Sequence, residues 1–236
     1  MSPSNSLLRT IFVCLLVCLA RVGHASSIIL DQQYIVGETV QPSGPFSDGL
    51  VFLDNYLGGY DLLTAQTFTV GVAGQLTGVD LQIGQWFGSG GNVTIGIYQT
   101  DGGGTPTGSA LASQSVPYDS LPAFTFGTTP FSSFDFSSAG LLVTPDQLLA
   151  IVAQADSTAQ SAWSVYAPGA YSGGIALSTY GDGSFQPYLF YTERVTGDFG
   201  FKTYVEPAAT AVPEPIGALL LGPGLVGWLV RRRNRL

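Results

Sequence analysis

The side chains of this sequence that could do chemistry are carboxylates and aromatic rings, because the usual nucleophiles and bases are confined to one end. Cys14, Cys18 and His24 are the only cysteines and the only histidine, and all three precede Ser26. If the segment before Ser26 is removed, no Ser/His/Asp or Cys/His catalytic set can form. Zinc and copper sites lose their preferred nitrogen and sulfur ligands for the same reason.

Calcium is the metal that fits the remaining composition, since it takes oxygen ligands from carboxylates and carbonyls. The candidate ligands are Asp54, Asp101 and Asp182, each of which stands beside asparagine or glycine in an expected loop. No calcium loop of alternating acids is present, and an aspartate next to glycine is also what tight turns select. Calcium and a simple turn are therefore alternatives at each position, and no other cofactor is expected.

Paired carboxylates are the remaining route to catalysis. Fifteen acidic residues between Ser26 and Val212 could supply the two carboxylates of a glycoside hydrolase, which must lie roughly 5 to 10 Å apart. Nothing in the sequence singles out one pair. We therefore expect a protein that is not an enzyme, with a carboxylate-based hydrolase as the catalytic alternative.

Aromatic residues offer surfaces on which a sugar ring could stack. Trp86 borders the glycine-rich stretch 88–91, and Trp163, Tyr171 and Tyr180 lie in an aromatic-rich segment. These four are the candidate glycan-binding residues. The same rings are also ordinary core and cross-strand partners in β-proteins, and their exposure decides between the two roles.

The charge of the body excludes two classes of partner. Two basic residues, Arg194 and Lys202, stand against fifteen acidic ones between Ser26 and Val212, which gives a formal charge of −13. Such a body repels nucleic acid and anionic membrane surfaces.

The elements that would position these residues are β-strands. Val79, Leu81 and Ile83 recur at every second position, as do the apolar residues at 93, 95 and 97. This period predicts half-buried strands, and the apolar run 148–155 predicts a central strand covered on both faces. With the turn clusters between them, the strands predict an all-β fold over residues 26–205, an antiparallel two-sheet β-sandwich of the jelly-roll kind. Residues 206–211 are expected to form a linker.

Residues 1–25 have the pattern of a secretory signal peptide. Arg9 precedes an apolar run at 11–20, and small residues occupy positions 23 and 25. The pattern predicts cleavage by signal peptidase between Ala25 and Ser26, with an uncleaved membrane anchor as the alternative.

Residues 212–236 combine an uncharged stretch with a basic cluster, 231–235. A helix over residues 216–230 would span roughly 22 Å, short of the roughly 30 Å hydrocarbon core, so its flanks must contribute to a crossing. The four basic residues should stay cytoplasmic and act as a membrane stop, which places the body across the membrane; they are Arg231, Arg232, Arg233 and Arg235. A buried core helix is the alternative.

Pro213, Glu214 and Pro215, followed by this stretch and the arginines, resemble the PEP-CTERM sorting signal of Gram-negative bacteria. The resemblance covers residues 212–236 and implies recognition by an exosortase, a membrane protease that is expected to cleave near the motif. The protein would be exported across the inner membrane, anchored transiently by the helix, and delivered to the cell surface or the extracellular space. Pro223, in the middle of the stretch, leaves the helix boundaries open.

The body resembles the choice-of-anchor β-sandwich domains that recur beside bacterial surface-sorting tails. The resemblance is carried by residues 66–70, 76–81, 93–95, 104–108 and 198–204. It implies a fold similar to carbohydrate-binding jelly rolls and brings no agreed activity.

Two functional hypotheses follow. We prefer an exported, non-catalytic cell-surface or extracellular-matrix protein associated with exopolysaccharide. The alternative is a carbohydrate-binding module with a defined glycan ligand, assisted by calcium. Buried rings would favour the first hypothesis, and an exposed coplanar pair of loop aromatics beside acids would favour the second.

Overall fold

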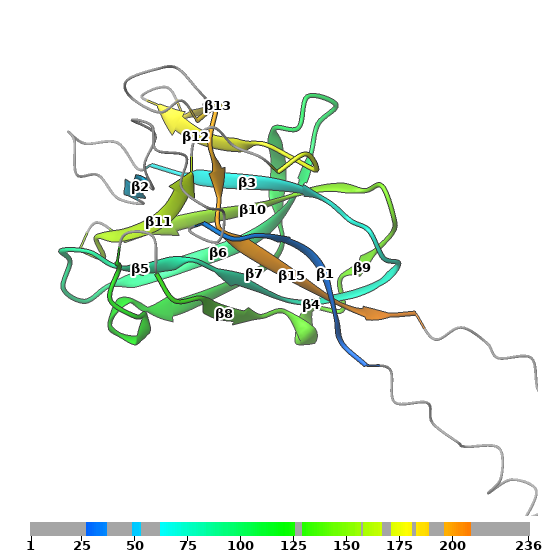
Figure 1. Cartoon of the computed structure of the whole chain (residues 1–236), viewed down its shortest axis with the longest axis horizontal. Coiled ribbons are helices and arrows are strands. Elements are labelled where there is room, and N and C mark those ends of the chain that lie inside the picture. The colour runs from blue at the N-terminus through cyan, green and yellow to red at the C-terminus, as the bar shows by residue number, and fades with distance from the viewer. Residues whose placement is uncertain are drawn as a thin grey trace, which may run out of the picture. The chain divides into compact units, whose positions relative to one another are not determined.

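A computed structural model describes residues 27–36, 49–52, 62–125, 129–156, 158–166, 171–180, 183–188 and 196–208, all within one unit, residues 25–208. In this part of the chain, β-strands and two short 3₁₀ turns are the only regular elements (Figure 1). The strands are β1 (Ile29–Tyr34), β2 (Gly49–Phe52), β3 (Thr64–Thr69), β4 (Gly74–Leu81), β5 (Ile83–Gln85), β6 (Asn92–Thr100), β7 (Pro106–Pro117), β8 (Ser132–Asp135), β9 (Leu142–Val143), β10 (Leu148–Ala155), β11 (Ser161–Tyr166), β12 (Ala176–Tyr180), β13 (Ser184–Pro187), β14 (Asp198–Phe199) and β15 (Phe201–Pro207). The turns are η1 (Tyr118–Ser120) and η2 (Ser137–Ala139).

The strands form three sheets whose ladders are all antiparallel, which confirms the predicted all-β class. The largest sheet has the order β13-β12-β3-β10-β6-β7. A second has the order β1-β15-β4-β8, with β9 also beside β4, and a third has the order β14-β11-β2, with β5 also beside β11.

The second and third sheets meet at three backbone hydrogen bonds around Gln82. The Ser164 N–H donates to the Gln82 carbonyl over 2.9 Å, and the Gln82 N–H donates to the Gly200 carbonyl over 3.0 Å. The Gly200 N–H donates to the Ser164 carbonyl over 3.0 Å, which closes the ring. Gln82 separates β4 from β5, and Gly200 separates β14 from β15, so these bonds make the two sheets one continuous layer.

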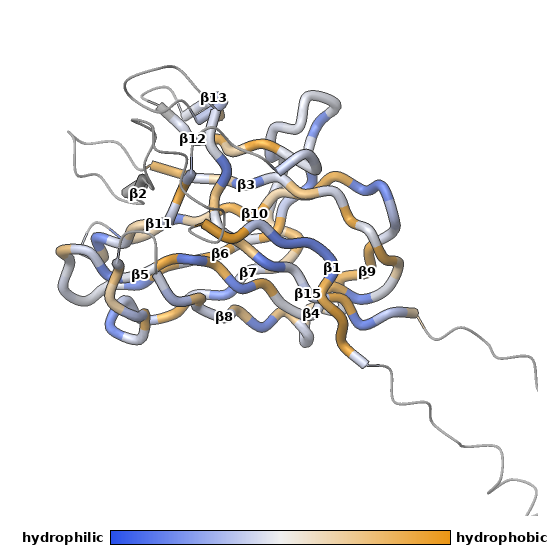
Figure 2. Tube along the Cα trace, viewed as in Figure 1, coloured by the Kyte–Doolittle hydropathy of each residue, from blue (hydrophilic) through white to orange (hydrophobic). Residues whose placement is uncertain are grey.

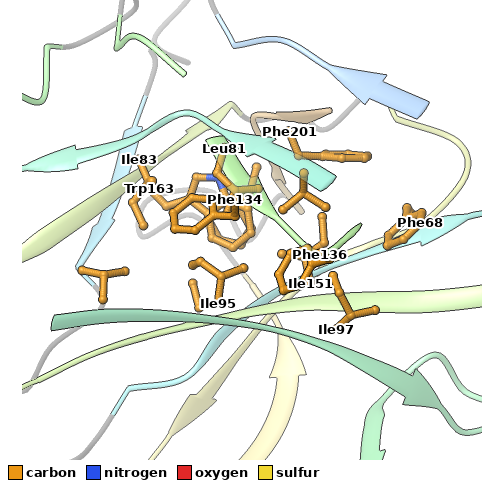
Figure 3. Close-up of a cluster of buried hydrophobic side chains, with 14 of the residues drawn as sticks. Phe68, Leu81, Ile83, Ile95, Ile97, Phe134, Phe136, Ile151, Trp163 and Phe201 are labelled. Carbon is orange, nitrogen blue, oxygen red and sulfur yellow. The ribbon is translucent and has the colours of Figure 1, made fainter. Parts of the chain in front are cut away.

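Between this layer and the largest sheet lies an apolar core to which both contribute (Figure 3). Leu81, Phe134 and Phe201 come from the second sheet, while Ile95 and Ile151 come from the largest sheet, and none of the five is more than 2 % exposed. The predicted alternation is confirmed, since the apolar residues at 79, 81, 83, 93, 95 and 97 are all buried. Figure 2 shows hydrophobic and hydrophilic residues interspersed along the strands, as a one-sided core requires.

Strand β10 is the predicted central strand. It pairs with β3 on one side and with β6 on the other. Leu149 and Ile151 enter the main core, whereas Ala150 and Val152 join a smaller cluster with Ala65 and Leu177. Apolar residues on both faces explain the continuous apolar run at 148–155.

The boundary at the end of the body differs from the prediction. Strand β15 continues to Pro207, because Glu206 pairs with Gln75 and Pro207 pairs with Gly74. The first two residues of the predicted linker 206–211 therefore belong to a sheet. The predicted signal peptide and the stretch 212–236 lie outside the described residues. Within the described part of the chain, no helix has the length and apolarity needed to cross a bilayer.

Candidate functional site

A cluster of buried polar side chains lies where residues 171–175 meet β3 and β14. Gln66 is fully buried in β3, and its Nε2 donates to the Asp198 Oδ1 over 3.3 Å. Its Oε1 accepts a hydrogen bond from the Phe199 N–H over 2.8 Å. Asp198 is only 4 % exposed, and its Oδ2 accepts a hydrogen bond from the Tyr171 N–H over 2.9 Å. One amide and one carboxylate thus tie three segments together.

The segment 171–175 lies directly against the backbone of β3. The Ile175 N–H donates to the Thr67 Oγ1 over 2.7 Å, and the Thr69 hydroxyl donates to the Gly173 carbonyl over 2.8 Å. A Cβ on Gly174 would collide with the Thr67 carbonyl oxygen, so only glycine allows this approach. Hydrogen bonds to β3 therefore hold residues 171–175 in place.

Tyr171 connects the cluster to β1. Its hydroxyl donates to the Gln32 Oε1 over 3.2 Å, and its ring meets Phe201 edge-on with centroids 5.1 Å apart. The neighbouring Asp31 accepts a hydrogen bond from the Gly71 N–H over 3.0 Å. We call Asp31, Gln32, Gln66, Tyr171 and Asp198 the Asp198 cluster.

Burial dominates the electrostatics of this cluster. Burial raises the pKa of Asp198 to about 6, although hydrogen bonds from Tyr171 and Gln66 act in the opposite direction. Burial also raises the pKa of Asp31. The pKa of Tyr171 rises to about 12, because of burial first and then of the nearby carboxylates of Asp31 and Asp198. Asp198 can therefore exchange a proton near pH 6, while the donors and acceptors of the cluster bind one another.

The structure corrects one of the four candidate glycan-binding residues. Trp163 is 0 % exposed, its indole Nε1–H donates to the Gly200 carbonyl over 2.9 Å, and its ring stacks on Phe199 at 4.7 Å. No face of this ring is open to a sugar, so the interpretation of Trp163 as a ligand-stacking residue is wrong. It is a core residue that also satisfies a carbonyl at the junction of two sheets.

Trp86 is half-buried in the loop that follows β5. Its ring meets Phe87 edge-on at 5.0 Å and 75°, and Phe124 edge-on at 5.5 Å and 82°. Phe87 is 72 % exposed. The loop is fixed by backbone hydrogen bonds from Trp86 to Gln160 and from Ser89 to Thr158. Trp86 and Phe87 are exposed in part, but their rings are not coplanar.

Of the other two candidates, the structure describes only the side chain of Tyr171. Tyr171 is half-buried inside the Asp198 cluster, and Tyr180 ends β12 with its side chain outside the described residues. The described structure therefore brings no two of the four candidates into one aromatic platform.

Asp101 forms a turn. Its Oδ1 accepts hydrogen bonds from the Gly103 N–H over 2.8 Å and from the Thr105 N–H over 2.9 Å. Asp54 and Asp182 lie outside the described residues. Among the residues that the structure describes, no group of three or more histidine, cysteine, aspartate or glutamate side chains could hold a metal ion. Asp101 thus has the turn role that was the alternative to calcium.

The sorting and cleavage residues are not part of the described structure. They are Ala25, Ser26, Pro213, Glu214, Pro215, Arg231, Arg232, Arg233 and Arg235. Comparison with known proteins finds no matching family model, no matching curated protein and no matching solved structure.

Sequence reasoning missed the two polar residues at the centre of the cluster. Gln66 and Asp198 are 132 positions apart and are brought together only by the fold. No local signal in the sequence singled out Gln66, since the full burial of its strand neighbours Thr64, Thr67 and Phe68 is visible only in the structure. A polar residue in such a strand indicates a buried partner elsewhere in the chain.

Proposed function

We propose that this chain is an exported, non-catalytic protein of the cell surface or extracellular matrix, sorted through a PEP-CTERM and exosortase-type system. The observation that carries the proposal is the order of three features after the body: Pro213-Glu214-Pro215, the uncharged stretch 216–230, and the arginines at 231–235. The secretory pattern of residues 1–25, with its cleavage position at Ala25, supports export.

The body of this proposed surface protein is a jelly-roll sandwich. Four antiparallel strand pairs support this fold, because they are nested as in one long hairpin. The pairs are β1 with β15, β3 with β10, β4 with β8, and β6 with β7. The hairpin is rolled up, because β15 also pairs with β4 and β10 also pairs with β6. Such a double-layer roll leaves loops at both ends for contacts.

A carbohydrate-binding module is the second candidate, favoured by the loop that follows β5. Phe87 is 72 % exposed beside the half-buried Trp86, and backbone hydrogen bonds to residues 158 and 160 hold both in place. A rigid exposed ring can stack on a sugar without an entropy loss in the loop. On this reading the protein binds a glycan of the surrounding exopolysaccharide directly.

Processing of the tail is tested by the intact mass of the exported protein. In a host with the exosortase, the protein released by wild-type cells should lack Arg231 to Leu236, because cleavage near Pro213 removes them. A Glu214→Ala variant should accumulate in the membrane fraction with the arginines attached. Glu206→Ala is the matched control, since Glu206 lies eight positions earlier in β15 and outside the motif. Finding the arginines still attached to exported wild-type protein would refute the sorting proposal.

A further inference from the structure

Three of the large exposed apolar residues lie toward one end of the body. Ile28, Leu30 and Leu142 are 59 %, 45 % and 75 % exposed. They lie on the sheet that contains β1, β15, β4 and β9, at the end where β15 stops. Figure 2 shows the hydrophobic start of β1 and the hydrophobic β9 near this end of β15.

The strand registers place Leu30 and Leu142 on the outer face of that sheet, and Ile28 directly precedes β1. Leu30 pairs with the half-buried Tyr204, whereas the next residue, Val205, is fully buried in the core. Leu142 pairs with Gln75, which in turn pairs with Glu206. We call Ile28, Leu30, Leu142 and Tyr204 the exit patch, because the chain leaves the body here.

The exit patch differs from the other exposed apolar residues of the described chain. Phe87, Leu111 and Ile175 belong to a loop after β5, to the edge strand β7 and to the segment before β12. Single exposed apolar residues are normal, but a group of them marks a contact surface.

The residues that follow β15 indicate what covers this surface. Strand β15 ends at Pro207, and residues 208–215 can span at most about 28 Å before the uncharged stretch begins at Ile216. If that stretch enters a bilayer, as the proposed function requires, the exit patch is held within reach of the lipid surface. We propose that the exit patch rests on the surface of the bilayer that the tail enters.

The chemistry of the patch fits a zwitterionic lipid surface. Aliphatic side chains with a tyrosine are suited to the boundary between headgroups and acyl chains. The Tyr204 hydroxyl donates to the Asp80 Oδ2 over 2.6 Å, so this polar group is already satisfied. Glu206, which lies between the β9 and β1 parts of the patch, and the formal charge of −13 disfavour an anionic surface. Docking here would hold Pro213-Glu214-Pro215 close to the membrane for its protease.

Single-cysteine labelling tests the proposal in the full chain. A Cys14→Ser, Cys18→Ser background removes both cysteines, and Leu142→Cys or Phe87→Cys then carries one environment-sensitive fluorophore. The two positions are matched, since they are 75 % and 72 % exposed. Phe87 lies thirteen positions after Gly74, which pairs with Pro207, so it is about 40 Å from the exit along β4 and β5.

The labelled chains are reconstituted through their tails into phosphatidylcholine vesicles containing a brominated lipid. The label at position 142 should be quenched at least about threefold more than the label at 87, because the boundary region is only about 5–10 Å deep. Ile28→Ser with Leu30→Ser should reduce the quenching at 142, and so should replacement of phosphatidylcholine by phosphatidylglycerol.

The outcomes separate this proposal from the sorting proposal. Equal quenching at 142 and 87 in chains that float with the vesicles would refute docking and leave the tail anchor intact. Chains that do not float would refute the tail anchor and the docking with it. Shielding of position 142 that depends on protein concentration and not on lipid would assign the patch to a second copy of the chain and overturn the proposal.

Discussion

The middle of the body and its Asp198 end hold the same two layers together in different ways. In the middle, Ile95, Phe134 and Ile151 meet through apolar contacts alone. At the other end, Gln66 crosses from β3 to β14 with hydrogen bonds to Asp198 and Phe199. Apolar contacts are non-directional, whereas a buried amide and carboxylate require one geometry. The apolar contacts of the middle do not depend on pH, whereas the Asp198 end makes the stability sensitive to pH.

Removing a large ring from the middle should have the largest effect. Phe134 is 2 % exposed and lies in the core on β8. Phe134→Ala should lower the free energy of unfolding by about 3–5 kcal/mol, because it loses apolar burial and leaves a cavity. Urea denaturation followed by tryptophan fluorescence measures the loss. Leu142→Ala, at a 75 % exposed position, should change the free energy by less than about 0.5 kcal/mol. A similar loss in both variants would contradict the division between core and surface.

The pH dependence should come from the Asp198 end. The pKa of Asp198 is about 6 in the folded protein, against an ordinary value of 3.8. The folded state therefore binds the proton more tightly, and this group stabilises the fold fully below about pH 3.8. As the pH rises through about 6, the contribution is lost, and the free energy of unfolding falls by about 3 kcal/mol at 1.36 kcal/mol per pKa unit.

Asp198→Asn isolates this contribution. Urea denaturation of wild type and variant at several pH values should give a smaller decrease for the variant between about pH 4 and about pH 6.5. Asp31, whose pKa burial also raises, and Asp135, whose pKa is lowered by hydrogen bonds from Ser137, titrate in both proteins and cancel in the difference. Parallel pH profiles for the two proteins would show that Asp198 is not the group that titrates.

The sequence predicts the apolar middle of the body better than it predicts which single rings are buried. Alternation at 79, 81 and 83 predicts an inward face because strand geometry alone determines it. The run at 148–155 predicts a covered strand for the same reason. Trp163 was open to two interpretations, because a pattern of aromatics does not reveal which rings are buried. Its burial depends on strands β5, β14 and β2, which come from distant parts of the sequence.

The Asp198 cluster could not be predicted because its members share no local pattern. Gln66 and Asp198 lie on strands 132 positions apart, and Tyr171 joins them from a third segment. Aspartate is usually solvated, so its default interpretation in a sequence is a surface or turn residue. The contacts of Asp198 with Gln66 and with the Tyr171 N–H, both distant in the sequence, change that environment. Periodicity thus predicts which face of a strand is buried, and tertiary contacts decide which polar residues are buried with it.

The smallest expected effect concerns the tyrosine that connects the cluster to β1. Tyr171→Phe removes the hydroxyl that donates to the Gln32 Oε1 and keeps the ring contact with Phe201. Because Tyr171 is half-buried, water can replace the lost donor, and the free energy of unfolding should fall by only about 0.5–1 kcal/mol.

Tyr118→Phe is the informative counterpart: Tyr118 is 3 % exposed and its hydroxyl accepts a hydrogen bond from the Gly88 N–H over 3.0 Å. That variant should lose more, about 1–3 kcal/mol, because the Tyr118 side chain is buried and its loss leaves the part-buried Gly88 donor without an acceptor. If urea denaturation ranks the two variants the other way round, solvent access does not control the energy of these hydrogen bonds.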